Sequence, residues 1–150
     1  MKKTNSFVKF IESAFKAIPP KSNEIPIGCA IINNNTKEII ATTNEINKKQ
    51  NVLAHAEIIA IEKANKKFRE ENNLYLNNCD IYITLEPCYM CSYATLKSRF
   101  RRVYFGASNP KEGAIEELAL KTHLYKPEIY GGIEEKRSQE LLDNFFKNKR

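Results

Sequence analysis

The sequence predicts a three-layer α/β/α sandwich around a mixed sheet of about five strands. Apolar stretches with the length of strands alternate with segments whose apolar residues recur at helical spacing. Residues 80–85 and 102–106 both read as strands and are separated by a single short helix, which implies a right-handed parallel crossover. Residues 25–32 and 37–43 flank an Asn-rich turn and read as an antiparallel hairpin. We expect residues 1–150 to form one domain.

Each expected element follows from apolar spacing and from the residues that end it. We expect helices at 5–17, from 54 to about 68, from 87 to about 97, at 114–120 and at the C-terminus, and strands at 25–32, 37–43, 80–85, 102–106 and 128–130. Pro19 and Pro20 end the first helix, since proline lacks an N–H and restricts the residue before it. The near-continuous apolar run at 80–85 is typical of a strand covered on both faces. The last helix carries an apolar stripe at 141, 142, 145 and 146, which predicts a docking face.

Composition places the chain among ordinary globular proteins, with 42% hydrophobic and 28% charged residues. The longest apolar stretches, such as 27–32, are too short to span a membrane. No unbroken apolar segment follows the N-terminal lysines, so we expect no signal peptide and a cytoplasmic protein. In that compartment four cysteines favour metal binding or catalysis over disulfides.

The net charge of +6 is weak support for a nucleic-acid partner, because Lys and Asn fill positions throughout the chain. A local basic cluster is more informative. It comprises Lys97, Arg99, Arg101 and Arg102, close in sequence to a cysteine pair. Two interpretations remain open for it, a partner contact and an ordinary solvated face.

Three short segments carry the chemistry: His55-Ala56-Glu57, then Glu86-Pro87-Cys88, then Cys91. Cysteines at i and i+3 on a helix share a face, and two thiolates with one imidazole suit zinc. Three protein ligands leave the fourth position of zinc open for water, whose pKa the metal lowers. Glu57, two residues after the histidine, is then placed to move protons as a general acid and base.

Less specific interpretations exist for the same residues. A structural zinc site needs a fourth ligand, which His123, Cys29 or Cys79 could supply. A redox pair would not need the His-x-Glu segment. A zinc-stabilised RNA-binding module would have no use for Glu57. We expect Cys29 and Cys79 to be free thiols and His123 to be a loop residue.

The segments 55–57 and 87–91 resemble the cytidine deaminase-like superfamily, whose members carry H-x-E and P-C-x-x-C. Within it, the chain resembles the bacterial tRNA-specific adenosine deaminases almost end to end. The likeness covers residues 26–29, 44, 53–58, 84–91, 98–99, 103–107 and 141–146.

This resemblance implies conversion of the wobble adenosine of a tRNA anticodon to inosine, with one zinc ion per chain and usually by a homodimer. The adenine would be flipped out of the anticodon loop. Asn44 matches the asparagine with which the family contacts the target nucleotide. Residues 106–113 match a loop that meets the anticodon strand, where Asn109 is a predicted substrate contact and Lys111 could hold a phosphate.

The alternative substrate is a free nucleobase or nucleoside (guanine, cytosine or cytidine) at the same zinc site. Three departures from the family pattern concern that choice: Ser108-Asn109-Pro110 replaces an Arg-Asp pair, Tyr93 replaces a glycine, and residues 123–126 replace a segment with Asn-His. A free-base enzyme would cap its pocket with its own C-terminus, whereas an RNA enzyme needs an open basic cleft. The basic tail of Lys147, Lys149 and Arg150 favours RNA.

Overall fold

A computed structural model describes residues 5–149, and within them one mixed sheet has the strand order β2-β1-β3-β4-β5. The strands are β1 (Gly28–Asn33), β2 (Ile39–Thr43), β3 (Cys79–Leu85), β4 (Arg102–Ala107) and β5 (Glu128–Tyr130). Strand β1 pairs antiparallel with β2 and with β3, while β3 with β4 and β4 with β5 pair in parallel. The predicted hairpin and the predicted parallel pair are both confirmed.

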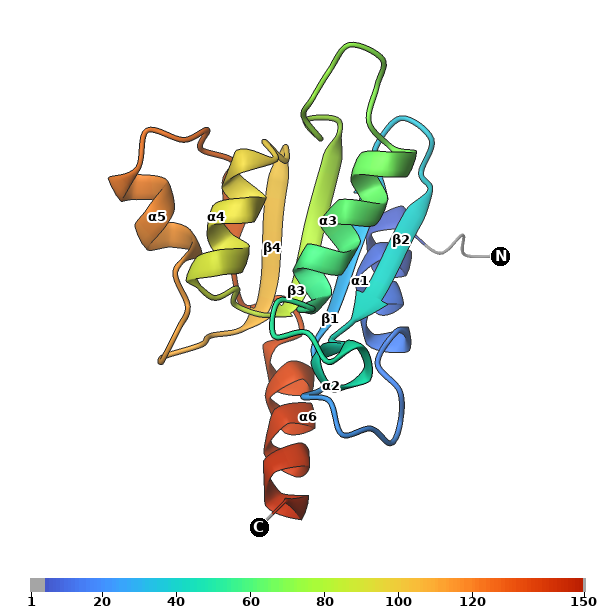
Figure 1. Cartoon of the computed structure of the whole chain (residues 1–150), viewed down its shortest axis with the longest axis vertical. Helices are drawn as coiled ribbons and strands as arrows, with labels where there is room; N and C mark the ends of the chain where they lie inside the picture. Colours follow the sequence, from blue (N-terminus) through green and yellow to red (C-terminus); the bar gives the residue numbers. More distant parts are fainter. Residues whose placement is uncertain (1–4, 150) are drawn as a thin grey trace.

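Helices cover both faces of the sheet, as the sandwich requires. They are α1 (Ser6–Lys16), α2 (Ile46–Lys49), α3 (Ala56–Lys67), α4 (Tyr89–Lys97), α5 (Ile115–Lys121) and α6 (Glu135–Asn148). Figure 1 shows α3 and α4 on one face, α1 on the other, and α6 extending past the lower ends of β3 and β4. Within β1, Cys29 and Ile31 join the core beneath α3 and α4, whereas Ala30 and Ile32 join the core beneath α1. The two-residue period of a strand therefore serves two cores, and the three-layer fold is confirmed.

Two boundaries differ from the expected ones because of backbone chemistry. The first strand begins at Gly28 instead of residue 25. Pro26 has no N–H to donate to a ladder, and the N–H of Ile27 donates to the carbonyl of Ile25 at 2.8 Å. Gly28 also lies so close to α1 that a Cβ would overlap the carbonyl of Ala14. The second strand begins at 39 because Lys37 has a positive φ of 65° and completes the turn.

The helices near the predicted site also differ in detail. Helix α3 begins at Ala56, with His55 as its N-cap, and not at residue 54. Pro87 lies before the N-cap of α4, Cys88, and not in the first turn. The short helix α2 was not predicted, because its start depends on a distant side chain. The carboxylate of Glu24 accepts hydrogen bonds from the N–H groups of Asn47 and Lys48 at 2.6 and 3.0 Å.

Between residues 5 and 149, none of the helices is both long enough and apolar enough to cross a membrane.

Candidate active site

The predicted metal ligands lie at the start of two helices that meet beside the end of β3. His55 is the N-cap of α3, and Cys88 is the N-cap of α4. Cys91 lies in the first turn of α4 and is fully buried. Helix N-termini carry partial positive charge, which favours thiolates there.

The ligand atoms of these residues converge. His55 Nδ1 lies 3.5 Å from Cys91 Sγ and 3.9 Å from Cys88 Sγ, and all three ligand atoms lie within 4.8 Å of one another. Tetrahedral zinc, with one nitrogen and two sulfur ligands, requires N···S separations of about 3.6 Å. The donor set and its spacing therefore fit one zinc ion.

The structure offers this group no fourth protein ligand from the part of the chain it describes. Cys29 and Cys79 are buried free thiols in β1 and β3, and His123 is exposed in the segment after α5. Burial raises the pKa of Cys79 to about 12, so this side chain stays a neutral thiol. The arrangement corresponds to an open, three-ligand site and not to a closed structural one.

The pKa values of the three ligand residues shift in different directions. A hydrogen bond from Cys91 lowers the pKa of Cys88 to about 4, with a further contribution from His55. The same hydrogen bond and burial raise the pKa of Cys91. Hydrogen bonding to Cys88 raises the pKa of His55. In the metal-free protein, Cys88 is therefore the thiolate of the group and Cys91 is a neutral thiol.

Glu57 is a buried carboxyl group beside this cluster, with 4% of its surface exposed. It lies in the first turn of α3. Burial, which disfavours the charged form, raises its pKa. A carboxyl group that accepts a proton readily is suited to general acid and base chemistry.

A cavity of about 840 Å³ opens onto His55, Glu57 and Cys88, within the range of about 300–1,000 Å³ that is usual for small-molecule sites. The three predicted substrate contacts all line it: Asn44, Asn109 and Lys111. The structure therefore brings these residues together, although they come from the end of β2 and from the loop after β4.

Asn44 is already engaged by the fold. It is 3% exposed, its Oδ1 accepts a hydrogen bond from the Ala56 N–H at 2.8 Å, and its Nδ2 donates to the carbonyl of Ile25 at 3.3 Å. A side-chain amide has two N–H donors. One donor of Asn44 is thus left for a bound molecule.

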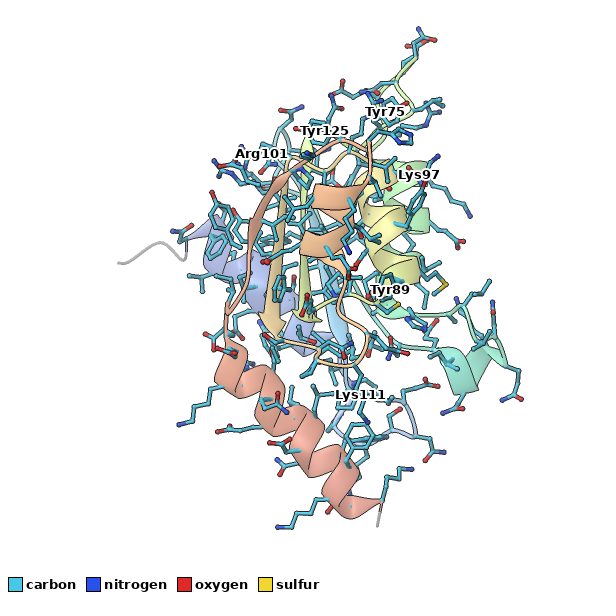
Figure 2. The ribbon with its side chains drawn as sticks, turned by 90° about the vertical axis from the view of Figure 1, so that its left-hand side faces the viewer. Tyr75, Tyr89, Lys97, Arg101, Lys111 and Tyr125 are labelled. Carbon is cyan, nitrogen blue, oxygen red and sulfur yellow. The ribbon has the colours of Figure 1, made fainter. Side chains whose placement is uncertain are left out.

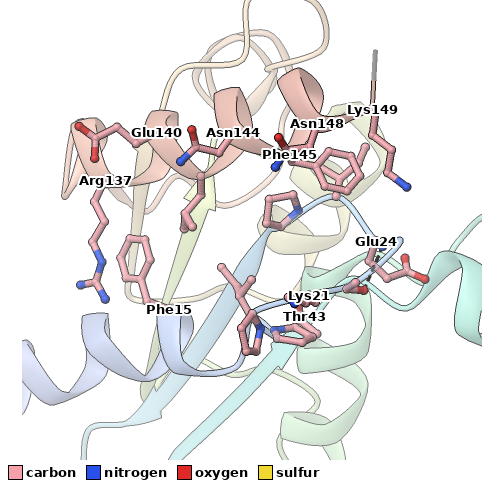
Figure 3. A pocket seen from close by; sticks show the side chains of 17 residues that line it. Phe15, Lys21, Glu24, Thr43, Arg137, Glu140, Asn144, Phe145, Asn148 and Lys149 are labelled. Carbon is pink, nitrogen blue, oxygen red and sulfur yellow. Dashed lines mark hydrogen bonds between the residues drawn. The ribbon is translucent and has the colours of Figure 1, made fainter.

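Helix α6 forms one wall of the cavity, which the sequence did not indicate. Leu142 and Phe146, four residues apart, line the cavity, whereas Leu141 and Phe145 line a second cavity of about 580 Å³ beside α1 (Figure 3). The predicted apolar stripe therefore divides between two sides of the helix. Phe146 is 48% exposed, so α6 is a side wall and not a cap. Of the predicted basic tail, Lys149 donates a hydrogen bond from Nζ to Oδ1 of Asn23 at 3.4 Å. Arg150 lies outside the described residues.

The basic cluster lies away from this cavity because α4 runs from the metal group toward the opposite end of the molecule. Figure 2 shows Lys97 and Arg101 near that end and Lys111 near α6. Arg101 forms a salt bridge of 2.7 Å with Asp80, and Arg102 one of 2.8 Å with Glu128. The Arg99 guanidinium lies 3.9 Å from the ring centroid of Tyr75. These contacts favour the interpretation of the cluster as a surface feature.

Comparison with known proteins agrees with this site. The family model of the cytidine and deoxycytidylate deaminase zinc-binding region matches residues 1–107. The chain belongs to this deaminase family. Zinc is the cofactor of this domain. The side chains of His55, Cys88 and Cys91 form a group that fits one zinc ion.

Individual relatives show which members of the family this chain is similar to in sequence and in structure. A tRNA-specific adenosine deaminase from Rickettsia felis is 43% identical over 130 residues, covering 83% of this chain and 88% of the relative. A solved structure from work on A-to-I editing at the wobble position of transfer RNA has a TM-score of 0.79 at 33% identity, covering 89% of this chain and 99% of the other. The resemblance to bacterial tRNA-specific adenosine deaminases is thereby confirmed. A guanine deaminase structure from Nitrosomonas europaea, with a TM-score of 0.64 at 19% identity, covers 91% of this chain and 79% of its own and shares the fold.

Proposed function

We propose that this deaminase converts the wobble adenosine of a tRNA anticodon to inosine by zinc-dependent hydrolysis. One observation carries the proposal: buried Glu57 adjoins the cluster of His55, Cys88 and Cys91 at the base of a cavity. The tRNA substrate is supported by the relatives named above, which cover most of the chain.

The reaction exchanges one bond at the adenine ring for another. A C–O bond forms at C6, the C–N bond to the amino group breaks, and adenosine plus water gives inosine plus ammonia. His55, Cys88 and Cys91 would hold zinc, which when bound supplies Lewis-acid activation of water. Glu57 takes one proton from the attacking water and gives it to the ring nitrogen, then takes the second proton from the new C6 hydroxyl and gives it to the amino group, which leaves as ammonia.

The cavity walls position the flipped-out adenosine. The free N–H of Asn44 faces the target nucleotide, and the ammonium group of Lys111 holds a phosphate of the anticodon strand. Leu142 and Phe146 of α6 give the base an apolar side wall. Asn109 contacts the substrate from the loop after β4.

We also propose a homodimer, which the resemblance implies, and a location in the cytoplasm, which the sequence predicts. Exposed apolar side chains lie close to the metal ligands in the chain: Val52 and Leu53 come just before His55, and Tyr89 and Tyr93 lie on α4 with Cys91. A second copy that covers them would remove this apolar surface from water. The thiolates of the zinc site also suit a reducing compartment.

The test compares RNA with free bases. The zinc-loaded protein is incubated with an anticodon stem-loop bearing a wobble adenosine, a matched stem-loop with guanosine there, and free guanine, cytosine and cytidine. We expect inosine in the first RNA alone, measured by mass spectrometry of nucleosides. Deamination of only the free compounds would replace the proposal with the free-base alternative. Zinc and RNA binding without any turnover would indicate a binding module.

A further inference from the structure

We propose that Glu86 is a positioning residue that ties the substrate loop, residues 108–113, to the metal cluster. This inference rests on the proposed function, because the loop is where Asn109 and Lys111 meet the substrate. Glu86 lies two residues before Cys88 and lines the same cavity. It is half-buried and is neither a member of the ligand group nor the proton carrier.

The backbone around Glu86 holds both ends of the loop. The N–H of Glu86 donates to the carbonyl of Ala107 at 2.8 Å, at the start of the loop. The carbonyl of Pro87 accepts a hydrogen bond from the N–H of Ala114 at 3.1 Å, at the end of the loop. The segment that leads to Cys88 is therefore bonded to the chain on each side of the substrate loop.

The Glu86 side chain holds the loop itself, near its start. Its Oε1 accepts a hydrogen bond from the backbone N–H of Asn109 at 3.1 Å. Asn109 in turn organises the rest of the loop, since its carbonyl accepts from Gly113 N–H at 2.8 Å and its Oδ1 accepts from Glu112 N–H at 3.2 Å. Loss of the Glu86 carboxylate would therefore release the residue on which the internal hydrogen bonds of the loop depend.

Gly113 provides the space that this contact needs. A Cβ at this position would overlap the carboxyl group of Glu86, and it would lie 2.6 Å from the carbonyl oxygen of Asn109. Any other residue would require the carboxylate of Glu86 or the carbonyl of Asn109 to move. Because Gly113 has no side chain, its backbone leaves room for the carboxylate of Glu86 to approach the loop closely and accept its hydrogen bond.

A fixed loop matters because the substrate must be oriented against the metal cluster. Displacement of substrate-positioning groups by about 1 Å can cost up to about a hundredfold in rate. Glu86 connects the position of Lys111 and Asn109 to that of Cys88 without touching the reacting atoms. Its effect should therefore fall on substrate affinity first.

The experiment compares Glu86→Ala, Glu86→Gln and Gly113→Ala with the zinc-loaded wild-type protein. Amide hydrogen exchange is followed at Asn109 and Gly113, and KM and kcat are measured with the anticodon stem-loop. We expect Glu86→Ala and Gly113→Ala to speed exchange at these amides and to raise KM about tenfold. Glu86→Gln keeps an oxygen acceptor and should restore most of both properties. Glu116→Ala, an exposed acidic residue on α5, is the matched control and should change neither.

Metal analysis and exchange in β3 separate this role from a general loss of stability, and both should match the wild-type protein. Unchanged exchange at Asn109 in Glu86→Ala, or faster exchange with unchanged KM and kcat, would overturn the proposal. A wild-type protein that leaves the stem-loop unmodified would overturn the proposed function instead. The exchange measurement would still decide whether Glu86 anchors the loop.

Discussion

The side-chain Oδ1 of Asn44 accepts a hydrogen bond of 2.8 Å from the backbone N–H of Ala56. Ala56 lies between His55 and Glu57, so this bond attaches the end of β2 to the start of α3. The same side chain thus fixes the backbone that presents a metal ligand and a proton carrier, and it belongs to a residue that lines the cavity and has one amide donor left.

We predict that Asn44→Ala destabilises the protein by about 1–3 kcal/mol, because it leaves the buried Ala56 N–H without its acceptor. Urea unfolding of the zinc-loaded protein measures this loss. Asn44→Asp keeps the acceptor but removes the amide donors, so it should lose less stability than Asn44→Ala while still raising KM for the stem-loop. Wild-type KM in the Asp variant would show that Asn44 serves the fold alone.

A second prediction concerns Glu57. Glu57→Gln has nearly the same shape but cannot carry a proton, and it lies outside the ligand group. We expect zinc content to stay at one ion per chain and kcat to fall by about 10²–10⁴, the usual contribution of general acid and base catalysis. Metal analysis and single-turnover deamination measure the two effects. Substantial turnover by this variant would assign the proton transfer to another group.

The cysteine pair of the metal cluster was predictable because local spacing determines it, whereas His55 lies 33 residues from Cys88 and joins the pair only where α3 and α4 meet. Two cysteines at i and i+3 share a helix face wherever the helix packs, and both helix starts carry their ligands at the N-cap. Glu57 follows from the same reasoning, since it is two residues from His55. The sheet was predictable for a similar reason, because strand and helix periods differ clearly in this chain.

The rest of the site depends on contacts between distant residues. The start of α2 depends on Glu24, more than twenty positions earlier, whose carboxylate replaces a local cap. The apolar stripe of α6 predicted a docking face, but no local signal shows that Leu142 faces one cavity and Leu141 another. The loop anchor at Glu86 was missed because its partner, Asn109, lies 23 residues away.

The third prediction assigns the zinc ligands. Cys88→Ser and His55→Ala should each reduce bound zinc toward zero, since removal of one of three protein ligands leaves a weak site. Cys79→Ala is the control, because this buried thiol lies in β3 outside the ligand group, and it should keep one zinc per chain. Zinc in full stoichiometry in the Cys88→Ser protein would point to a different ligand set.

Removal of the metal should expose a single fast-reacting cysteine. In the metal-free protein the pKa of Cys88 is lowered to about 4, so this half-buried residue is a thiolate throughout the range from pH 6 to 8. Cys91 is buried with a raised pKa, as are Cys29 and Cys79. After chelation, iodoacetamide should modify Cys88 first, at a rate that stays level from pH 8 to 6 and falls only as the pH approaches 4. Peptide mapping identifies the site. A tenfold rise per pH unit between 6 and 8 would instead indicate an ordinary thiol with a pKa near about 8.5.

The last prediction tests the direction from which RNA approaches. Lys111 lines the active-site cavity, whereas Lys97 lies toward the far end of α4 (Figure 2). Each phosphate contact to single-stranded RNA contributes about 0.7 to the slope of log affinity against log salt concentration. Lys111→Ala should therefore weaken binding of the anticodon stem-loop and reduce that slope by about 0.7, while Lys97→Ala, which removes the same charge, should leave both unchanged. Binding is measured by fluorescence anisotropy over a range of salt concentrations. Equal losses in the two variants would mean that RNA responds to the overall charge of the protein, and a larger loss at Lys97 would place the RNA on the basic cluster.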